Sequence, residues 1–226
     1  MNKFSTILSR ITELDNLVKG FKQSELVLIG ARLSVGKTLF ALSMISNIAI
    51  KDKKPVGYFS LEMNSETVVD RLLFCEGNFI SNPTSEQIEP THCNQLTAER
   101  IYEAPLYIED TPNISLQELK AKARRLKSEK HVEIIFIDYL TLITSEKKSS
   151  NKQVAGISSS LKSLADELNI PIIVLVQVKR NDKGLQPTLM DIRGSESIVG
   201  EADTIIFLHK LKNGKTELIL AKHRTS

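Results

Sequence analysis

The segment 30–38, Gly-Ala-Arg-Leu-Ser-Val-Gly-Lys-Thr, has the residue types and the spacing of a loop that binds phosphate groups. The general pattern is G-x-x-x-x-G-K-[ST], and Ala31 stands where the first glycine is usual. Backbone N–H groups of such a loop surround a β-phosphate, and the helix that follows adds positive potential. We expect Lys37 to reach the β- and γ-phosphates and Thr38 to offer its hydroxyl group to Mg²⁺. The residues expected to bind the phosphates are Ala31, Arg32, Ser34, Val35, Gly36, Lys37, Thr38 and Leu39.

Three polar residues follow other apolar runs. Asp138 ends the run 134–138, a pattern typical of a strand whose carboxylate holds Mg²⁺ through water. Glu62 follows the run 57–61, where it either polarises an attacking water molecule or is an ordinary acidic residue just before a helix N-cap. Gln177 ends a further run, and its amide either contacts a γ-phosphate or is a buried amide with its hydrogen bonds satisfied.

Several basic residues in the second half of the chain are candidates for binding anions. Lys222 and Arg224 end the last apolar run. Cations at a strand end are most often solvated, and the alternative is that these two reach the phosphates bound by a neighbouring copy. Arg193, together with Arg180 and Lys183, has the charge to contact a nucleic-acid backbone.

The composition is that of one ordinary globular domain, because 41% of the 226 residues are hydrophobic and 25% are charged. Cys75 and Cys93 cannot build a disulfide framework, and no secretory leader is evident, so we expect a cytoplasmic protein. No apolar run approaches the ~20 residues of a membrane helix. Residues 114–226 carry 19 Lys and Arg against 13 Asp and Glu, so this half either faces a polyanion or has an ordinary solvated surface.

Short apolar runs rich in Val and Ile alternate with longer helical patterns, as expected for strands buried on both faces of a parallel sheet. Asn213-Gly214 separates two extended runs and predicts an antiparallel hairpin. The sequence therefore predicts a mostly parallel, doubly wound α/β sheet flanked by helices, with an antiparallel hairpin at its C-terminal edge. The expected strands cover 26–30, 56–61, 106–108, 134–138, 172–178, 204–208 and 216–221.

The first residues of the chain form a separate apolar pattern. Apolar side chains recur at helical spacing at Phe4, Ile7, Leu8, Ile11 and Leu14. They predict a helix that either covers the domain's own core or docks on a neighbouring subunit. We therefore divide the chain into an N-terminal linker or docking segment, 1–18, and the phosphate-binding α/β domain, 19–226.

Taken together, the motifs resemble the C-terminal ATPase domain of DnaB-type replicative DNA helicases, a RecA-like P-loop motor. The resemblance extends over nearly the whole chain, and Ala31 is usual in this family. Beyond the P-loop it rests on the segments Phe-Ser-Leu-Glu-Met (59–63), Ala-Pro-Leu-Tyr-Ile-Glu-Asp-Thr-Pro (104–112), Ile-Asp-Tyr-Leu (137–140), Gln177, Asp-Ile-Arg (191–193), Glu-Ala-Asp (201–203) and Ala-Lys-His-Arg (221–224).

The resemblance implies that the nucleotide is ATP and that Mg²⁺ accompanies it. It implies that Glu62 activates water, that Gln177 senses the γ-phosphate and that Asp138 supports the metal. Arg71 would lie near the adenine. Lys222 and Arg224 would act on the ATP of the next subunit.

The resemblance also implies partners. Six copies would form a ring that moves along single-stranded DNA and unwinds the duplex during replication, with primase and a helicase loader as further partners. The loop containing Arg193, Gly194 and Glu196 would line the central channel, with Arg180 and Lys183 nearby. The family's usual order in this loop, Arg-Glu-Ser-Gly, appears here as Arg-Gly-Ser-Glu (193–196). The family's N-terminal collar domain and the strand that usually follows the last cations are not within the chain, as expected for a fragment.

Two other functions remain open at this point. One is an assembly module in which ATP only holds subunits together around DNA. The other is a different RecA-like ATPase, such as a recombinase. Glu62, Gln177 and Arg224 favour the motor, because simple nucleotide binding does not require them. The segments 59–63 and 191–193 disfavour the recombinase.

Overall fold

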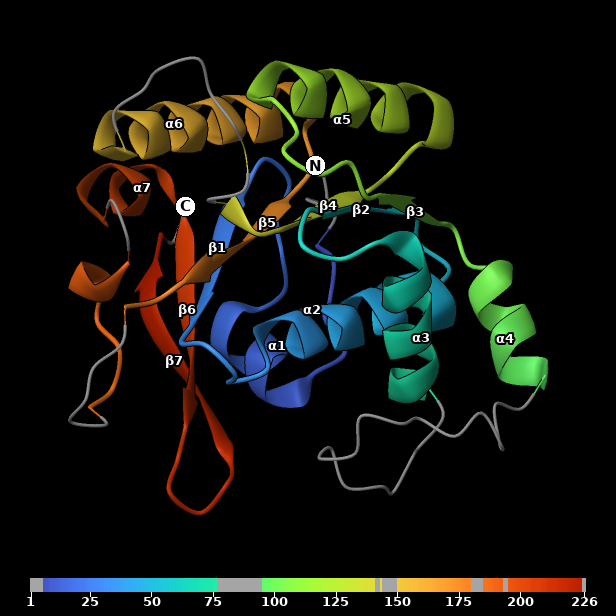
Figure 1. The fold of residues 1–226 in the computed structure, drawn as a ribbon, viewed down its shortest axis with the longest axis horizontal. Coiled ribbons are helices and arrows are strands. Elements are labelled where there is room, and N and C mark those ends of the chain that lie inside the picture. Colours follow the sequence, from blue (N-terminus) through green and yellow to red (C-terminus); the bar gives the residue numbers. More distant parts are fainter. Residues whose placement is uncertain are drawn as a thin grey trace, which may run out of the picture.

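The computed structural model describes residues 6–76, 95–140, 143, 150–179, 185–192 and 195–224, and for 150–155 and 195–196 it describes the backbone only. Within these residues, seven strands form one sheet in the order β3-β2-β4-β5-β1-β6-β7 (Figure 1). All neighbouring strands are parallel except β6 and β7. The strands are β1 (Leu26–Ala31), β2 (Val56–Ser60), β3 (Leu106–Glu109), β4 (Ile134–Asp138), β5 (Ile172–Gln177), β6 (Thr204–Lys210) and β7 (Thr216–His223).

Helices cover both faces of the sheet. Figure 1 shows α5, α6 and α7 on one face and α1, α2 and α3 on the other, with α4 beyond the β3 edge. Each face has its own apolar cluster, and the strands contribute to both. The helical segments are α1 (Thr12–Val18), α2 (Lys37–Ile45), the π-helical η1 (Ser46–Lys51), α3 (Ser65–Glu76), α4 (Gln95–Tyr102), α5 (Leu116–Lys130), α6 (Ser150–Leu168), the 3₁₀ turn η3 (Leu189–Asp191) and α7 (Ser195–Glu201).

The expected fold class is confirmed. Every expected strand is present, with ends displaced by a few residues, because continuous Val and Ile runs are stable only where both faces of a strand are covered. The hairpin turns at Asn213-Gly214, where Gly214 has φ 81° and the Asn213 side chain accepts a hydrogen bond from the Lys215 amide. Ser115 caps α5 by accepting from the Glu118 amide at 3.1 Å. No helix among the described segments is long and apolar enough to cross a lipid bilayer.

The helix expected from the stripe 4–14 is wrong at its beginning. Ile7 is extended and exchanges two backbone hydrogen bonds with Phe21, and the helix α1 begins only at Thr12. Ile7 and Leu14 are nonetheless buried in the core cluster that also contains α2 and η1. The strand-like pairing prevails because Phe21, fully buried at the start of the domain, offers Ile7 both an apolar contact and backbone partners. Of the stripe residues that the structure describes, Ile7, Ile11 and Leu14 therefore cover the domain's own core, whereas Leu8 is 47% exposed.

We predict that Leu14→Ala lowers the free energy of unfolding by about 2–5 kcal/mol, because Leu14 is fully buried and the change leaves a cavity. Leu17→Ala is the matched control on the same helix, since Leu17 is 38% exposed, and we expect it to change stability by less than about 0.5 kcal/mol. Urea denaturation of the two variants checks this. Equal effects would mean that α1 is not packed on the domain.

Candidate nucleotide-binding site

The P-loop lies between the carboxyl end of β1 and the start of α2. β1 is fully buried and ends at Ala31, and α2 begins at Lys37. Gly36, the N-cap residue, has φ 98° and makes no side-chain cap, so the first amides of α2 remain available as donors. A Cβ on Gly36 would meet nothing within 4 Å, so the backbone angle and not the space explains the glycine. The loop thus presents a helix N-terminus to an anion.

A buried carboxylate joins β4 to this loop. The Thr38 hydroxyl donates to Asp138 Oδ2 at 2.7 Å, and Lys37 Nζ lies 3.8 Å from Asp138 Oδ1. Tyr58 on β2 donates to the same Oδ2 at 3.4 Å. Register explains the meeting, because Ser60 at the end of β2 pairs with Asp138 at the end of β4. Side chains from β2, from β4 and from the start of α2, which follows β1, therefore form one polar cluster around Asp138.

The Asp138 carboxylate fits a site for a hard cation such as Mg²⁺. It is 1% exposed, and its Oδ1 atom is buried without a hydrogen-bond partner. A buried oxygen without a donor is unfavourable unless something else satisfies it, and carboxylate and hydroxyl oxygens are the ligands that Mg²⁺ prefers. Burial, and then the nearby Asp138 charge, raise the pKa of the Tyr58 hydroxyl, so Tyr58 stays a neutral donor.

The side chain of Lys37 is largely buried, with 13% of it exposed. Burial lowers the pKa of its ammonium group, although Asp138 and Glu62 pull in the other direction. Its Nζ atom also lies 4.5 Å from the centroid of the Tyr139 ring, within the range of a cation–π contact. Because the nearby carboxylates compensate this charge only in part, an added anion such as a phosphate would be favourable here.

Two further expected catalytic side chains, Glu62 and Gln177, line a cavity that Lys37 and Thr38 also line, and its volume is about 380 Å³. Glu62 is exposed to it, while Asn64 caps α3 by accepting from the Thr67 amide at 3.0 Å. Glu62 thus lies two residues before the N-cap, as expected, and both readings of its role remain predictions. Gln177 is exposed at the end of β5, so the reading of a buried, satisfied amide is wrong. The cavity is lined by Ala31, Arg32, Leu33, Ser34, Gly36, Lys37, Thr38, Leu39, Glu62, Met63, Arg71, Tyr139 and Gln177.

Sequence reasoning assigned no role to two tyrosines. Tyr139 forms part of the cavity wall and contacts Lys37, and its signal was its position directly after Asp138. Tyr58 gave no signal, because a tyrosine inside an apolar strand is ordinary core. Arg32 was expected among the residues that bind the phosphates; its guanidinium donates to the Leu185 carbonyl at 2.6 Å, and its Nε is buried without a hydrogen-bond partner.

The two candidate trans-acting cations lie far from this cavity. His223 pairs with Thr204, and Thr204 pairs with Val27 near the amino end of β1, whereas the P-loop follows its carboxyl end. Lys222 and Arg224 therefore lie at the end of the sheet opposite their own P-loop. Of the residues expected at DNA, Arg180, Lys183, Arg193 and Gly194 lie outside the described residues, as does the side chain of Glu196 in α7.

Comparison with known proteins gives one consistent result. Residues 6–226 match the family described as DnaB-like helicase C terminal domain. The chain is 46% identical over 224 residues to the replicative DNA helicase DnaB of Treponema pallidum, covering 96% of this chain and 51% of that protein. It is 40% identical to that of Geobacillus stearothermophilus, covering 94% and 51%. The chain thus spans about half the length of these curated relatives.

Two solved structures share the fold. One is an ATPase domain, which superposes with a TM-score of 0.83 at 31% identity, covering 98% of this chain and 84% of that one. The other, a DnaB-like replicative helicase solved in a study of its interactions with primase, gives a TM-score of 0.82 at 31% identity, covering 99% and 59%. The mostly parallel sheet with its antiparallel C-terminal pair is therefore the RecA-like arrangement of these ATPase domains.

We predict that Thr38→Val lowers the free energy of unfolding by about 1–2 kcal/mol, because it removes the donor to a buried carboxylate without changing the side-chain shape. Thr38→Ser keeps the hydroxyl and is the matched control, with a smaller loss. Denaturant titration without nucleotide separates the two. An equal loss for both would show that the hydroxyl contributes nothing to Asp138.

Proposed function

Since the chain belongs to the family of DnaB-like helicase C terminal domains, we propose that it is the ATP-hydrolysing motor of a replicative DNA helicase. One observation carries the proposal. The P-loop side chains Lys37 and Thr38 meet the buried carboxylate of Asp138, and the same cavity is lined by Glu62 and Gln177. A binder of nucleotide needs only the first three, whereas hydrolysis needs a base and a contact to the γ-phosphate.

Thr38 and Asp138 are the residues that would hold Mg²⁺. The Oδ1 atom of Asp138, which is buried without a hydrogen-bond partner, and the Thr38 hydroxyl supply the oxygen ligands that this ion prefers. When bound, Mg²⁺ would neutralise charge on the β- and γ-phosphate oxygens. The chain's own contribution beside it is Lys37, whose partly buried ammonium group would contact the same phosphate oxygens.

Glu62 is the proposed general base. Its carboxylate takes a proton from a water molecule as the water oxygen bonds to the γ-phosphorus and the bond from that phosphorus to the bridging oxygen breaks, which leaves ADP and phosphate. Gln177, exposed at the tip of β5, would contact the γ-phosphate and change position when it is released. Arg71, on α3 at the cavity wall, would lie near the adenine.

Lys222 and Arg224 would complete the site of the next subunit. Because they lie at the end of the sheet opposite their own P-loop, they cannot serve their own nucleotide. A cation supplied in this way contributes about 10³–10⁵ to the rate. Hydrolysis would then require a homo-oligomer with heterologous contacts, which closes as a ring, and six subunits are the proposed number.

The activity of the whole protein is proposed on the same basis. The ring would move along single-stranded DNA, held by Arg193, Gly194, Glu196, Arg180 and Lys183, and would separate the duplex during replication in the cytoplasm. A related helicase was solved in a study of its interactions with primase, and we propose primase and a loader as partners here. An assembly module that only binds ATP is the second candidate, and the following experiments separate it from a motor.

We expect Glu62→Gln to bind nucleotide normally and to lower the hydrolysis rate by about 10²–10⁴-fold, because the amide cannot accept the proton. Binding is measured with a fluorescent ATP analogue and hydrolysis by phosphate release. Glu66→Gln is the matched control, since Glu66 is an exposed glutamate on α3 that does not line the cavity. If Glu62→Gln hydrolyses ATP as fast as the unsubstituted chain, the assembly module would be favoured.

Arg224→Ala should abolish most ATP turnover, and mixing it with Glu62→Gln should restore some. In an equal mixture about one quarter of the interfaces combine an intact pocket with an intact cation. The rate of the parent should rise steeply with protein concentration and increase with single-stranded DNA. Absence of recovery in assemblies shown to contain both chains would exclude action in trans.

A further inference from the structure

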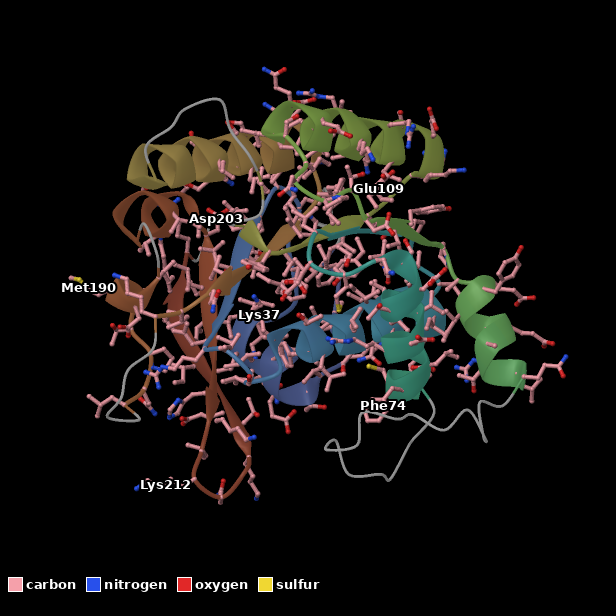
Figure 2. The ribbon with its side chains drawn as sticks, viewed as in Figure 1. Lys37, Phe74, Glu109, Met190, Asp203 and Lys212 are labelled. Carbon is pink, nitrogen blue, oxygen red and sulfur yellow. The ribbon has the colours of Figure 1, made fainter. Side chains whose placement is uncertain are left out.

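One carboxylate lies beside the cations that serve the neighbouring subunit. Asp203 stands just before β6, at the amino end of the sheet, and its side chain is 16% exposed. This largely buried carboxylate has no role in the hydrolysis proposed for Glu62, Lys37 and Gln177. Figure 2 labels Asp203 and Lys37, which lie apart from one another.

The Asp203 side chain is clamped by the core of the domain. Its Oδ2 atom accepts from the Leu26 amide at 2.9 Å and from Lys162 Nζ at 3.0 Å. Leu26 is fully buried as the first residue of β1, and Lys162 projects from α6. Burial lowers the pKa of Lys162, but hydrogen bonds to Asp203 and Asp166 outweigh it and raise that pKa, so the clamp stays charged.

The clamped carboxylate faces Arg224 with its other oxygen. Arg224 Nη1 lies 3.5 Å from Asp203 Oδ1, and the Arg224 amide donates to the Asp203 carbonyl at 2.9 Å. Arg224 Nη2 donates to the Gly200 carbonyl at 2.7 Å. The guanidinium has five donors in one plane, so these contacts engage one edge while the group stays 54% exposed. The remaining donors are available to a phosphate outside the chain.

Asp203 also offsets a local excess of positive charge. Lys222 donates to the Val199 and Gly200 carbonyls at the C-terminal end of α7. Partial burial, and then the neighbouring Arg224, lower the pKa of Lys222, whereas Asp203 acts in the opposite direction. Without the Asp203 charge, Lys162, Lys222 and Arg224 would repel one another, and the exposed Arg224 side chain is the one free to move away.

We propose that Asp203 is the positioning residue of the trans-acting Arg224: its carboxylate, clamped by the Leu26 amide and Lys162, fixes the guanidinium at the amino end of β1 so that its outer donors face the neighbour's phosphates. The inference rests on the proposed function of Arg224 in trans. The chain's own phosphate loop then follows one end of β1, and Arg224, which serves the neighbouring subunit, is held at the other end. The four-residue step from Val27 to Ala31 spans about 13 Å. Asp203 acts only through Arg224 and touches no reacting atom.

Asp203→Asn tests this in the same assembled protein. The amide oxygen still accepts from Leu26 and Lys162, but the amide nitrogen turns a donor toward Arg224. We expect kcat to fall about 10- to 100-fold, as for a catalytic group displaced by about 1 Å, with nucleotide affinity unchanged. In an Arg224→Ala background, Asp203→Asn should lower kcat no further.

Mixing assigns the defect to one side of the interface. Asp203→Asn mixed with Glu62→Gln should recover activity, because intact pockets then meet intact cations, whereas Asp203→Asn mixed with Arg224→Ala should not recover. Asp166→Asn is the matched control, because it neutralises the other carboxylate that Lys162 contacts, and its kcat should stay within about twofold of that of the unsubstituted chain. If Asp203→Asn fails to fold, Asp203→Glu keeps the charge, displaces it by one methylene and follows the same mixing rule.

Two results overturn the proposal. Recovery with Arg224→Ala, or no recovery with Glu62→Gln, would show that Asp203 acts on the chain's own pocket or on stability alone. If Arg224→Ala and Glu62→Gln do not complement one another, the trans role of Arg224 itself fails, and this inference falls with it.

Discussion

The hydrogen bond from Thr38 to the buried carboxylate of Asp138 ties the two halves of the site together. It joins the first turn of α2 to the end of β4, across a sheet in which β5 separates β4 from β1. Asp138 is almost fully buried and one of its oxygens has no donor, so the protein's own groups satisfy this carboxylate incompletely. The missing hydrogen bond to this oxygen lowers stability, and it also makes the site favourable for a cation.

The parallel sheet explains why these groups meet. Strands β1, β2, β4 and β5 are parallel, so their carboxyl ends lie at the same end of the sheet. The side chains that end or follow these strands therefore come together there: Lys37, Glu62, Asp138 and Gln177. The antiparallel strand β7 runs in the opposite direction, so Lys222 and Arg224 lie at the amino ends of the parallel strands. The P-loop site and the two cations of one chain therefore lie at opposite ends of the sheet, and this polarity follows from the direction of a single strand.

The sequence predicted some elements well and others poorly. The strands and the hairpin were predictable because each depends on local chemistry: continuous burial and an Asn-Gly turn. The helix over 4–14 was not, because the backbone partners of Ile7 come from Phe21 and the pairing overrides the local apolar spacing. Gln177 was left open between two roles, since its exposure depends on where β5 ends.

The sequence by itself determined the chemistry available to this protein: a phosphate loop, a carboxylate after an apolar strand, and cations at the end of the chain. Each of these is a short pattern whose function follows from the residue types and their spacing. Only the tertiary structure decided which groups share a cavity and which face away. It brought Tyr58 and Tyr139 to the site and placed Asp203 against Arg224, because strand order and register, which depend on contacts between distant residues, set those distances.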